Sequence, residues 1–174
     1  MPLVPANGAN AATSAVNAQI TKLQNGDLIK SNVDIAKDLA AAYHDYAKSA
    51  TLPGADMSAG GTVSILEAAF VPDNTPGMAT QIAQGICDYW SSFAVAGVPA
   101  HGGTSVITVV VNGASVFAAM TSAVQSLITD AQTTDVWLNF YQQTEIVVKT
   151  IPCTITEMMP GSPPYPQAWQ ETIT

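Results

Sequence analysis

The side chains with the widest capacity for chemistry in this chain are two histidines, His44 and His101, and two cysteines, Cys87 and Cys153. A zinc site needs several such ligands, and it usually places two of them in a short motif such as CxxC or HxxxH. The chain contains neither motif, so we expect no metal centre. We expect Cys87 and Cys153 to be buried, reduced thiols, with a disulfide or a reactive thiol as the alternatives.

Nucleophilic catalysis is the other chemistry that these residues could support. A small hydrolase could use Cys87 or a serine as the nucleophile and His101 as the base, but the chain lacks the GxSxG, HExxH and GxxxxGKS/T motifs. His101 lies in the sequence VPAHGGT, which is typical of a turn, and the polar helix face that His44 shares with Lys48 indicates a solvent-exposed histidine. We therefore expect a protein that is not an enzyme, with no catalytic residue and no cofactor.

Charged residues are few, and none of them is arginine. The 174 residues include five lysines and thirteen acidic residues, which give a net charge of -8, and only 10% of the chain is charged, against about 25% in an average soluble domain. Arginine supplies the bidentate contacts that read phosphates and guanine edges, so we expect no direct binding of nucleic acid. A surface this poor in charge fits a protein whose faces are covered by other subunits.

Apolar residues recur at helical spacing in four segments. These segments are Asn10 to Gln24, Ser31 to Lys48, Met78 to Ala94 and Ala114 to Ala131. The second begins with Ser31 and Asp34, which fit a capping box. The first ends at Asn25 and Gly26, which tolerate the left-handed conformation that often closes a helix.

Runs of β-branched residues predict strands in the second half of the chain. We expect extended structure at Thr104 to Asn112, Glu145 to Ile151 and Cys153 to Glu157, with Pro152 at a sheet edge or bend. Asp135 to Thr144 fits either a helix or a strand, and we favour a helix. Together these elements predict an α+β fold in which an alanine-rich helical bundle packs on a small, mostly antiparallel sheet.

We expect three parts along the chain. Residues 1–9 are predicted to form an extended N-terminal arm with no secretory signal, 10–158 a single globular domain, and 159–174 an extended tail of prolines and aromatics. No apolar run is long enough to cross a membrane. Within the domain, 36–66 and 79–108 fit an internal repeat of a helix, a Gly-Gly-Thr turn and an apolar segment, although alanine-rich helices also resemble one another by chance.

The two ends carry the residues that we expect to contact neighbouring subunits. The tail holds four prolines between Met159 and Trp169, which keep it extended and semi-rigid. The predicted assembly contacts are Pro163, Pro164, Tyr165, Pro166, Trp169, Leu3 and Val4.

The stretch from Asn32 to Thr108 contains the pattern AxxLAxAYxDYxxxA, starting at Ala36, followed by a glycine-rich turn and a Thr/Val strand. Together with the alanine-rich first helix and the aromatic-proline tail, this stretch resembles small virion structural proteins of tailed bacteriophages. The resemblance implies a non-enzymatic subunit of the neck, tail or baseplate that is assembled in the host cytoplasm and incorporated into the virion. Its implied partners are copies of itself and neighbouring virion proteins.

The resemblance carries no catalytic residues across. The absence of arginine favours a position in the particle that does not face packaged DNA. The alternatives are a capsid decoration protein or host-surface-binding module, and a small hydrolase that uses Cys87 or a serine with His101.

Overall fold

The computed structural model describes residues 3–72, 77–99, 102–103, 105–129 and 135–174. In chain order its elements are α1 (Pro5–Gln24), α2 (Asn32–Ala47), β1 (Ala55–Asp56), α3 (Val63–Ala69), α4 (Met78–Ser91), β2 (Ala96–Gly97), β3 (Ser105–Val111), the 3-10 helix η1 (Gly113–Val116), α5 (Phe117–Thr129), α6 (Val136–Val148), β4 (Pro152–Met159) and β5 (Tyr165–Thr172). The described part of the chain is therefore an α+β fold, as the sequence predicted. None of its helices combines the length and the apolar character needed to cross a membrane.

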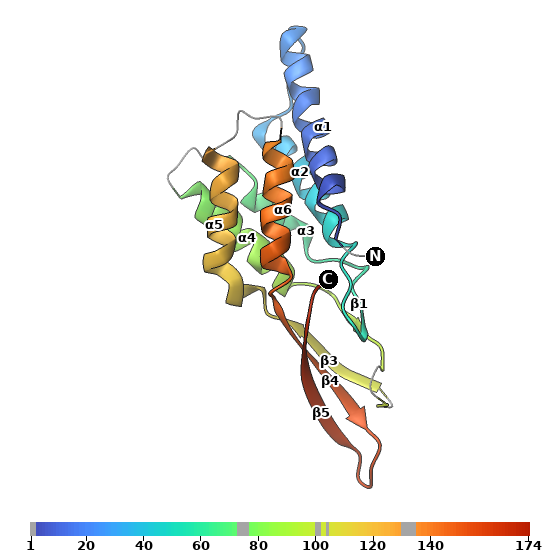
Figure 1. The fold of residues 1–174 in the computed structure, drawn as a ribbon. Coiled ribbons are helices and arrows are strands. Elements are labelled where there is room, and N and C mark those ends of the chain that lie inside the picture. The colour runs from blue at the N-terminus through green and yellow to red at the C-terminus, as the bar shows by residue number, and fades with distance from the viewer. Residues whose placement is uncertain (1–2, 73–76, 100–101, 104, 130–134) are drawn as a thin grey trace.

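The helices form a bundle from which the larger sheet projects (Figure 1). Helix α1 packs against α2 and α6, α4 packs against α3 and α5, and α5 also packs against α6. Strands β4 and β5 form a hairpin that extends away from one end of the bundle, while the last turns of α1 extend beyond the opposite end (Figure 1). The molecule is thus a helical body with a projection at each end.

Helix α2 begins as the capping box predicts. Ser31 is its N-cap, and the Ser31 Oγ accepts a hydrogen bond of 3.2 Å from the backbone N–H of Asp34, which satisfies one of the free donors at the helix start. Residues at helical spacing along α2 are buried. They are Ala36, Leu39, Ala40, Ala42, Tyr43, Tyr46 and Ala47.

Helix α1 starts earlier than predicted. The sequence predicts a helix from Asn10 preceded by an arm, but residues 5–9 form the first turns of α1. Pro5 suits this position, because a residue at the first turn of a helix does not need its N–H for an intrahelical bond. The side chain of Leu3, just before the helix, is only 4% exposed and belongs to the core.

Helix α6 corrects one strand prediction. The sequence predicts an extended segment from Glu145 to Ile151, but residues 145–148 continue α6 and lead into a turn. Tyr141, Thr144 and Val148 are buried at helical spacing, so packing of this face against the bundle outweighs the β propensity of the final β-branched residues. The preference for a helix over residues 136–144 is confirmed.

The larger sheet is antiparallel, with β4 between β3 and β5. Pro152 is the first residue of β4, a position that tolerates a residue without an N–H. The segment predicted to be an extended tail is extended, but it contains β5, which pairs with β4 along its whole length, from Thr172 opposite Pro152 to Tyr165 opposite Met159.

The last residues of the chain are anchored in the body. Ile173 is 1% exposed and lies in the core. The backbone of Thr174 exchanges two hydrogen bonds of 3.0 Å with the backbone of Thr51, in the connection that follows α2. The C-terminal segment is therefore part of the fold.

The two segments compared as an internal repeat share their helices but differ in the element after the glycine turn. Helices α2 and α4 bury equivalent positions, namely Ala36 and Ala79, Leu39 and Ile82, Ala40 and Ala83, and Tyr46 and Tyr89. Strands β1 and β2 come after these two helices and pair with each other. After Gly61, however, the chain continues into α3, whereas after Gly103 it continues into β3, so the likeness ends at the glycine turns.

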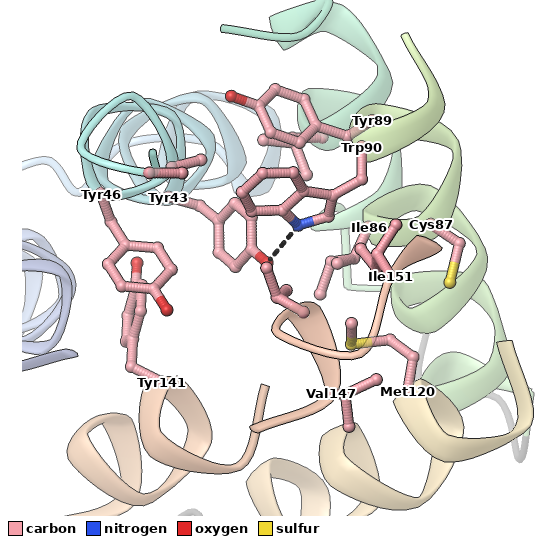
Figure 2. Packing of buried hydrophobic residues seen from close by; sticks show 14 of the residues in the cluster. Tyr43, Tyr46, Ile86, Cys87, Tyr89, Trp90, Met120, Tyr141, Val147 and Ile151 are labelled. Carbon is pink, nitrogen blue, oxygen red and sulfur yellow. Dashed lines mark hydrogen bonds between the residues drawn. The ribbon is translucent and has the colours of Figure 1, made fainter. Parts of the chain in front are cut away.

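Tyr43 lies at the centre of the buried core (Figure 2). Its Oη accepts a hydrogen bond of 3.1 Å from the Trp90 Nε1, so two buried polar atoms satisfy each other. Five aromatic rings surround the Tyr43 ring at centroid distances between 5.6 and 6.3 Å. They belong to Tyr46, Phe70, Tyr89, Phe140 and Tyr141.

The contact between α3 and α4 predicts an unusual effect of a helix substitution. A Cβ added at Gly85 would overlap the Cβ of Ala69. Gly85→Ala should therefore lower the free energy of unfolding by about 1–3 kcal/mol, although Gly to Ala inside a helix usually raises it by about 0.5–1 kcal/mol. Urea denaturation measures the change, with Thr80→Ala on the exposed face of α4 as the control.

A compensating substitution sharpens this test. Ala69→Gly in the same chain removes the overlapping methyl group, so the double variant should recover part of the lost stability. Gly85→Ala that stabilises the protein by itself would contradict the close packing of α3 on α4.

Candidate assembly surfaces

His44 is partly buried, so the prediction of a solvent-exposed histidine is wrong. Its Nδ1 shares a hydrogen bond of 2.8 Å with the Oη of Tyr89, and a Cβ added at Gly60 would overlap its imidazole. Burial lowers the pKa of His44, and the positive charge of Lys48 lowers it further. The residue therefore joins α2 to α4 as a neutral hydrogen-bonding group, which its polar neighbours in the sequence did not indicate.

The two cysteines are free and fully buried, as the preferred interpretation predicted. Burial raises the pKa of Cys87 and of Cys153 to about 11, so both are thiols at neutral pH rather than thiolate nucleophiles. His101, the partner considered for Cys87, lies outside the described residues. Within the described ranges, no three side chains of His, Cys, Asp or Glu gather in a way that could hold a metal ion.

The predicted contact residues at the end of the chain occupy two environments. Pro163, Pro164, Tyr165 and Pro166 are exposed at the turn and the beginning of β5, and Tyr165 is 52% exposed. Trp169 is half-buried, lies opposite Ile155 on β4 and packs against the core. The turn is therefore available to a partner, whereas Trp169 helps hold β5 to the body.

The hairpin also presents a strand edge. Among the described strands, β5 pairs only with β4. Its second edge offers backbone donors and acceptors to an added strand, except at Pro166, which has no N–H.

The two predicted contact residues at the beginning of the chain also lie in different environments. Leu3 belongs to the core, so it is not available to a partner in the folded protein. Val4 precedes α1 as its N-cap and is 38% exposed. Of this pair, only Val4 remains on the surface.

An exposed apolar surface at the end of α1 was missed by the sequence prediction. All residues from 20 to 34 are exposed, and we call them the projecting segment. The segment contains the end of α1, the connection to α2 and the first turn of α2, and its large aliphatic residues are Ile20, Leu23, Leu28, Ile29 and Val33. Their exposed fractions range from 47% at Ile20 to 94% at Leu28.

The apolar spacing from Asn10 to Gln24 predicts an amphipathic helix. Val16 does pack against the core, but Ile20 and Leu23, in the last turns of α1, are exposed, and this end of α1 extends beyond the bundle (Figure 1). Only the relative lengths of the packed helices reveal this, and they are a property of the tertiary structure.

The tip of the projecting segment has a defined backbone. Gly26 adopts a φ of 74°, which is favourable for glycine. The N–H of Gly26 donates to the Leu23 carbonyl at 3.2 Å and that of Asp27 to the Lys22 carbonyl at 2.9 Å. This pair of bonds is a Schellman motif, which ends α1 and reverses the chain.

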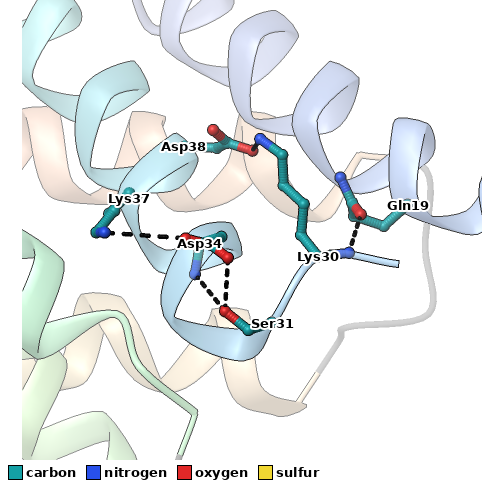
Figure 3. Close-up of polar contacts among 6 residues, drawn as sticks. All are labelled: Gln19, Lys30, Ser31, Asp34, Lys37 and Asp38. Atoms are coloured by element: carbon teal, nitrogen blue, oxygen red, sulfur yellow. Dashed lines mark hydrogen bonds and ion pairs between the residues drawn. The ribbon is translucent and has the colours of Figure 1, made fainter. Parts of the chain in front are cut away.

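Lys30 links the connection between α1 and α2 to both of these helices (Figure 3). Its backbone N–H donates to the Gln19 Oε1 at 2.9 Å, and its Nζ lies 2.6 Å from the Asp38 Oδ2. Leu28 and Ile29 are thus held on an ordered turn between α1 and α2.

An apolar groove of about 270 Å³ opens at the same end of the helical body. Its lining residues come from four helices (α2, α4, α5 and α6) and from the chain after α3, and they are Leu39, Phe70, Pro72, Met78, Ile82, Leu127 and Trp137. We call it the end groove. Apart from the indole N–H of Trp137 and the weakly accepting thioether of Met78, these side chains offer a ligand no hydrogen-bonding group, so the groove suits aliphatic or aromatic side chains.

The burial of His44 predicts a pH dependence of stability. Because its pKa is lower in the folded protein than its usual value of 6.5, neutral His44 contributes its full stability above about pH 6.5, and this contribution is lost as the pH falls through the lower folded pKa. His44→Gln should therefore reduce the fall in unfolding free energy between about pH 7.5 and about pH 5. Urea denaturation at both pH values measures it, and an identical fall in the variant would contradict the prediction.

The buried thiols predict a reactivity that depends on folding. In the native protein at about pH 8, a disulfide reagent such as DTNB should modify neither Cys87 nor Cys153. In denaturant both thiols should react, so that the reagent releases two equivalents of its thiolate per protein chain. The Cys87→Ser variant, with one thiol left, should give one equivalent. Rapid labelling of Cys87 in the native state would revive the nucleophile hypothesis.

The turn and the free strand edge of the hairpin, the projecting segment and the end groove are surfaces that the described residues offer to a partner. No known protein family, no curated protein and no solved structure matches this chain.

Proposed function

We propose that this protein is a non-enzymatic structural subunit of a multi-copy assembly, namely a virion component of the neck, tail or baseplate of a tailed bacteriophage. It acts by packing against copies of itself and against neighbouring virion proteins. Its location is the virion, which is assembled in the host cytoplasm. The assignment to a virion rests on the resemblance of residues 32–108, and the assignment to an assembly rests on the surface.

The projecting segment is the observation that carries the proposal. Leu23 and Leu28 are 66% and 94% exposed on a helix end and turn that extend beyond the bundle. Burial of an aliphatic side chain stabilises a protein by about 1.5–3 kcal/mol. The aliphatic side chains of the projecting segment are exposed in a single copy, so they gain little of this stabilisation there. A contiguous exposed apolar surface on a soluble protein marks an interaction site.

The distribution of charge supports the same proposal. The projecting segment contains Lys22, Lys30, Asp27 and Asp34 and has no net charge, so the whole charge of -8 belongs to the remaining residues. The segment is therefore the part of the chain that can approach another acidic copy with least repulsion.

A second candidate function is supported by the turn of the hairpin. Tyr165 is half-exposed among Pro163, Pro164 and Pro166, and exposed aromatic residues on rigid backbones are frequent anchors at binding sites. This surface suits a capsid decoration or host-surface-binding protein. Binding of the isolated protein to host cells, lost in Tyr165→Ser, would favour this candidate.

The oligomeric state of the full chain tests the proposed function. Sedimentation velocity over roughly 1 to 100 µM should show a discrete oligomer, and electron microscopy of that oligomer should show its symmetry. A stable monomer over the whole range that fails to join virion particles would contradict the proposal.

Point substitutions are the appropriate probes of these surfaces. Removing the residues after Met159 would take β5 from the sheet and Ile173 from the core, so a truncated chain would test folding rather than assembly. Tyr165→Ser leaves both in place.

A further inference from the structure

We infer that two copies of this chain dock end to end, each placing its projecting segment in the end groove of the other. The inference rests on the proposed function and names the partner of that surface, which is a second copy of the chain. Leu28, at 94% exposure the most exposed large aliphatic side chain among the residues whose burial the structure describes, is the central residue of each contact.

The position of the two surfaces makes the contact reciprocal. Helix α1 runs toward the end of the body at which α2 begins and α6 begins (Figure 1). The end groove is lined there by residues such as Met78, in the first turn of α4, and Trp137, in the first turn of α6. When two copies meet through this end, the segment of each faces the groove of the other, which is the condition for a symmetric twofold interface.

The two surfaces also match in size and chemistry. The groove volume of about 270 Å³ exceeds the roughly 150 Å³ that holds a benzene-sized molecule, so it accepts a few aliphatic side chains. The segment supplies residues 20–34 and the groove seven more, which together fall within the range of about 20–30 residues that each partner contributes to a standard interface.

The segment does not fill the groove of its own copy. None of its residues lines that groove, and Lys30 ties the turn to Gln19 on α1 and Asp38 on α2 (Figure 3). The turn that carries Leu28 is thus already ordered before docking, which reduces the conformational entropy that binding would otherwise cost.

Two complementary charge substitutions test the inference in the full-length protein. Leu28→Lys alters the segment, and Met78→Glu alters the groove. Each variant alone places two mismatched contacts in a dimer, so we expect each to raise the dissociation constant at least tenfold in sedimentation experiments. In an equimolar mixture, one contact joins the two introduced charges and the other is native, so the dimer should return.

Controls separate this interface from other effects. Ile146→Lys changes an aliphatic residue on α6 that is 62% exposed and should leave association unchanged, whereas Tyr165→Lys tests the hairpin. Circular dichroism and urea denaturation check each fold. If Met78→Glu unfolds the protein, Leu28→Lys still decides, because a side chain that is 94% exposed supports no core contact.

Each outcome has one interpretation. Association that is insensitive to Leu28→Lys, or a mixture of folded variants that fails to recover the dimer, overturns the reciprocal docking. If association is instead lost in Tyr165→Lys, the docking is wrong but the proposed assembly function stands. A wild-type protein that stays monomeric overturns the docking, and the proposed function also fails if that monomer does not join virion particles.

Discussion

The hydrogen bond between Trp90 and Tyr43 is the contact on which the rest of this structure depends. It joins α4 to α2 in the middle of the core, and rings from α6 and from the end of α3 surround the same tyrosine. A buried hydroxyl and a buried indole N–H each need a partner, and here each satisfies the other. The pairing joins α2 to α4, and the rings packed around Tyr43 bring α6 and the end of α3 to the same point.

Local sequence signals identified most elements but not where each one ends. Ser31 and Gly26 were informative, because a cap and a left-handed turn depend on neighbouring residues only. The end of α6 was not predicted, since Val147 and Val148 favour a strand by propensity and a helix by packing. For β5, the prolines indicated an extended chain correctly, but its pairing with β4 depends on residues that precede it in the sequence.

The same distinction applies to the candidate contact residues: residue type identified some of them, whereas the tertiary structure decides whether each one is exposed. Tyr165 and its neighbouring prolines could be selected by residue type, and the structure leaves them exposed. Leu3 and Trp169 have the same apolar character, but the core takes up the first and partly covers the second. Leu28 was not selected, because its exposure results from α1 being longer than the bundle that it packs against, and no property of the residue itself reports that.

The hairpin is rooted in the body at two separate points. Strand β4 continues directly from α6 through the buried Ile151, and β5 ends at the paired backbones of Thr174 and Thr51. A force applied at the turn near Tyr165 is therefore shared between two anchors. Displacement of the tip therefore acts on two separate parts of the body, α6 and the connection after α2, and not on one alone.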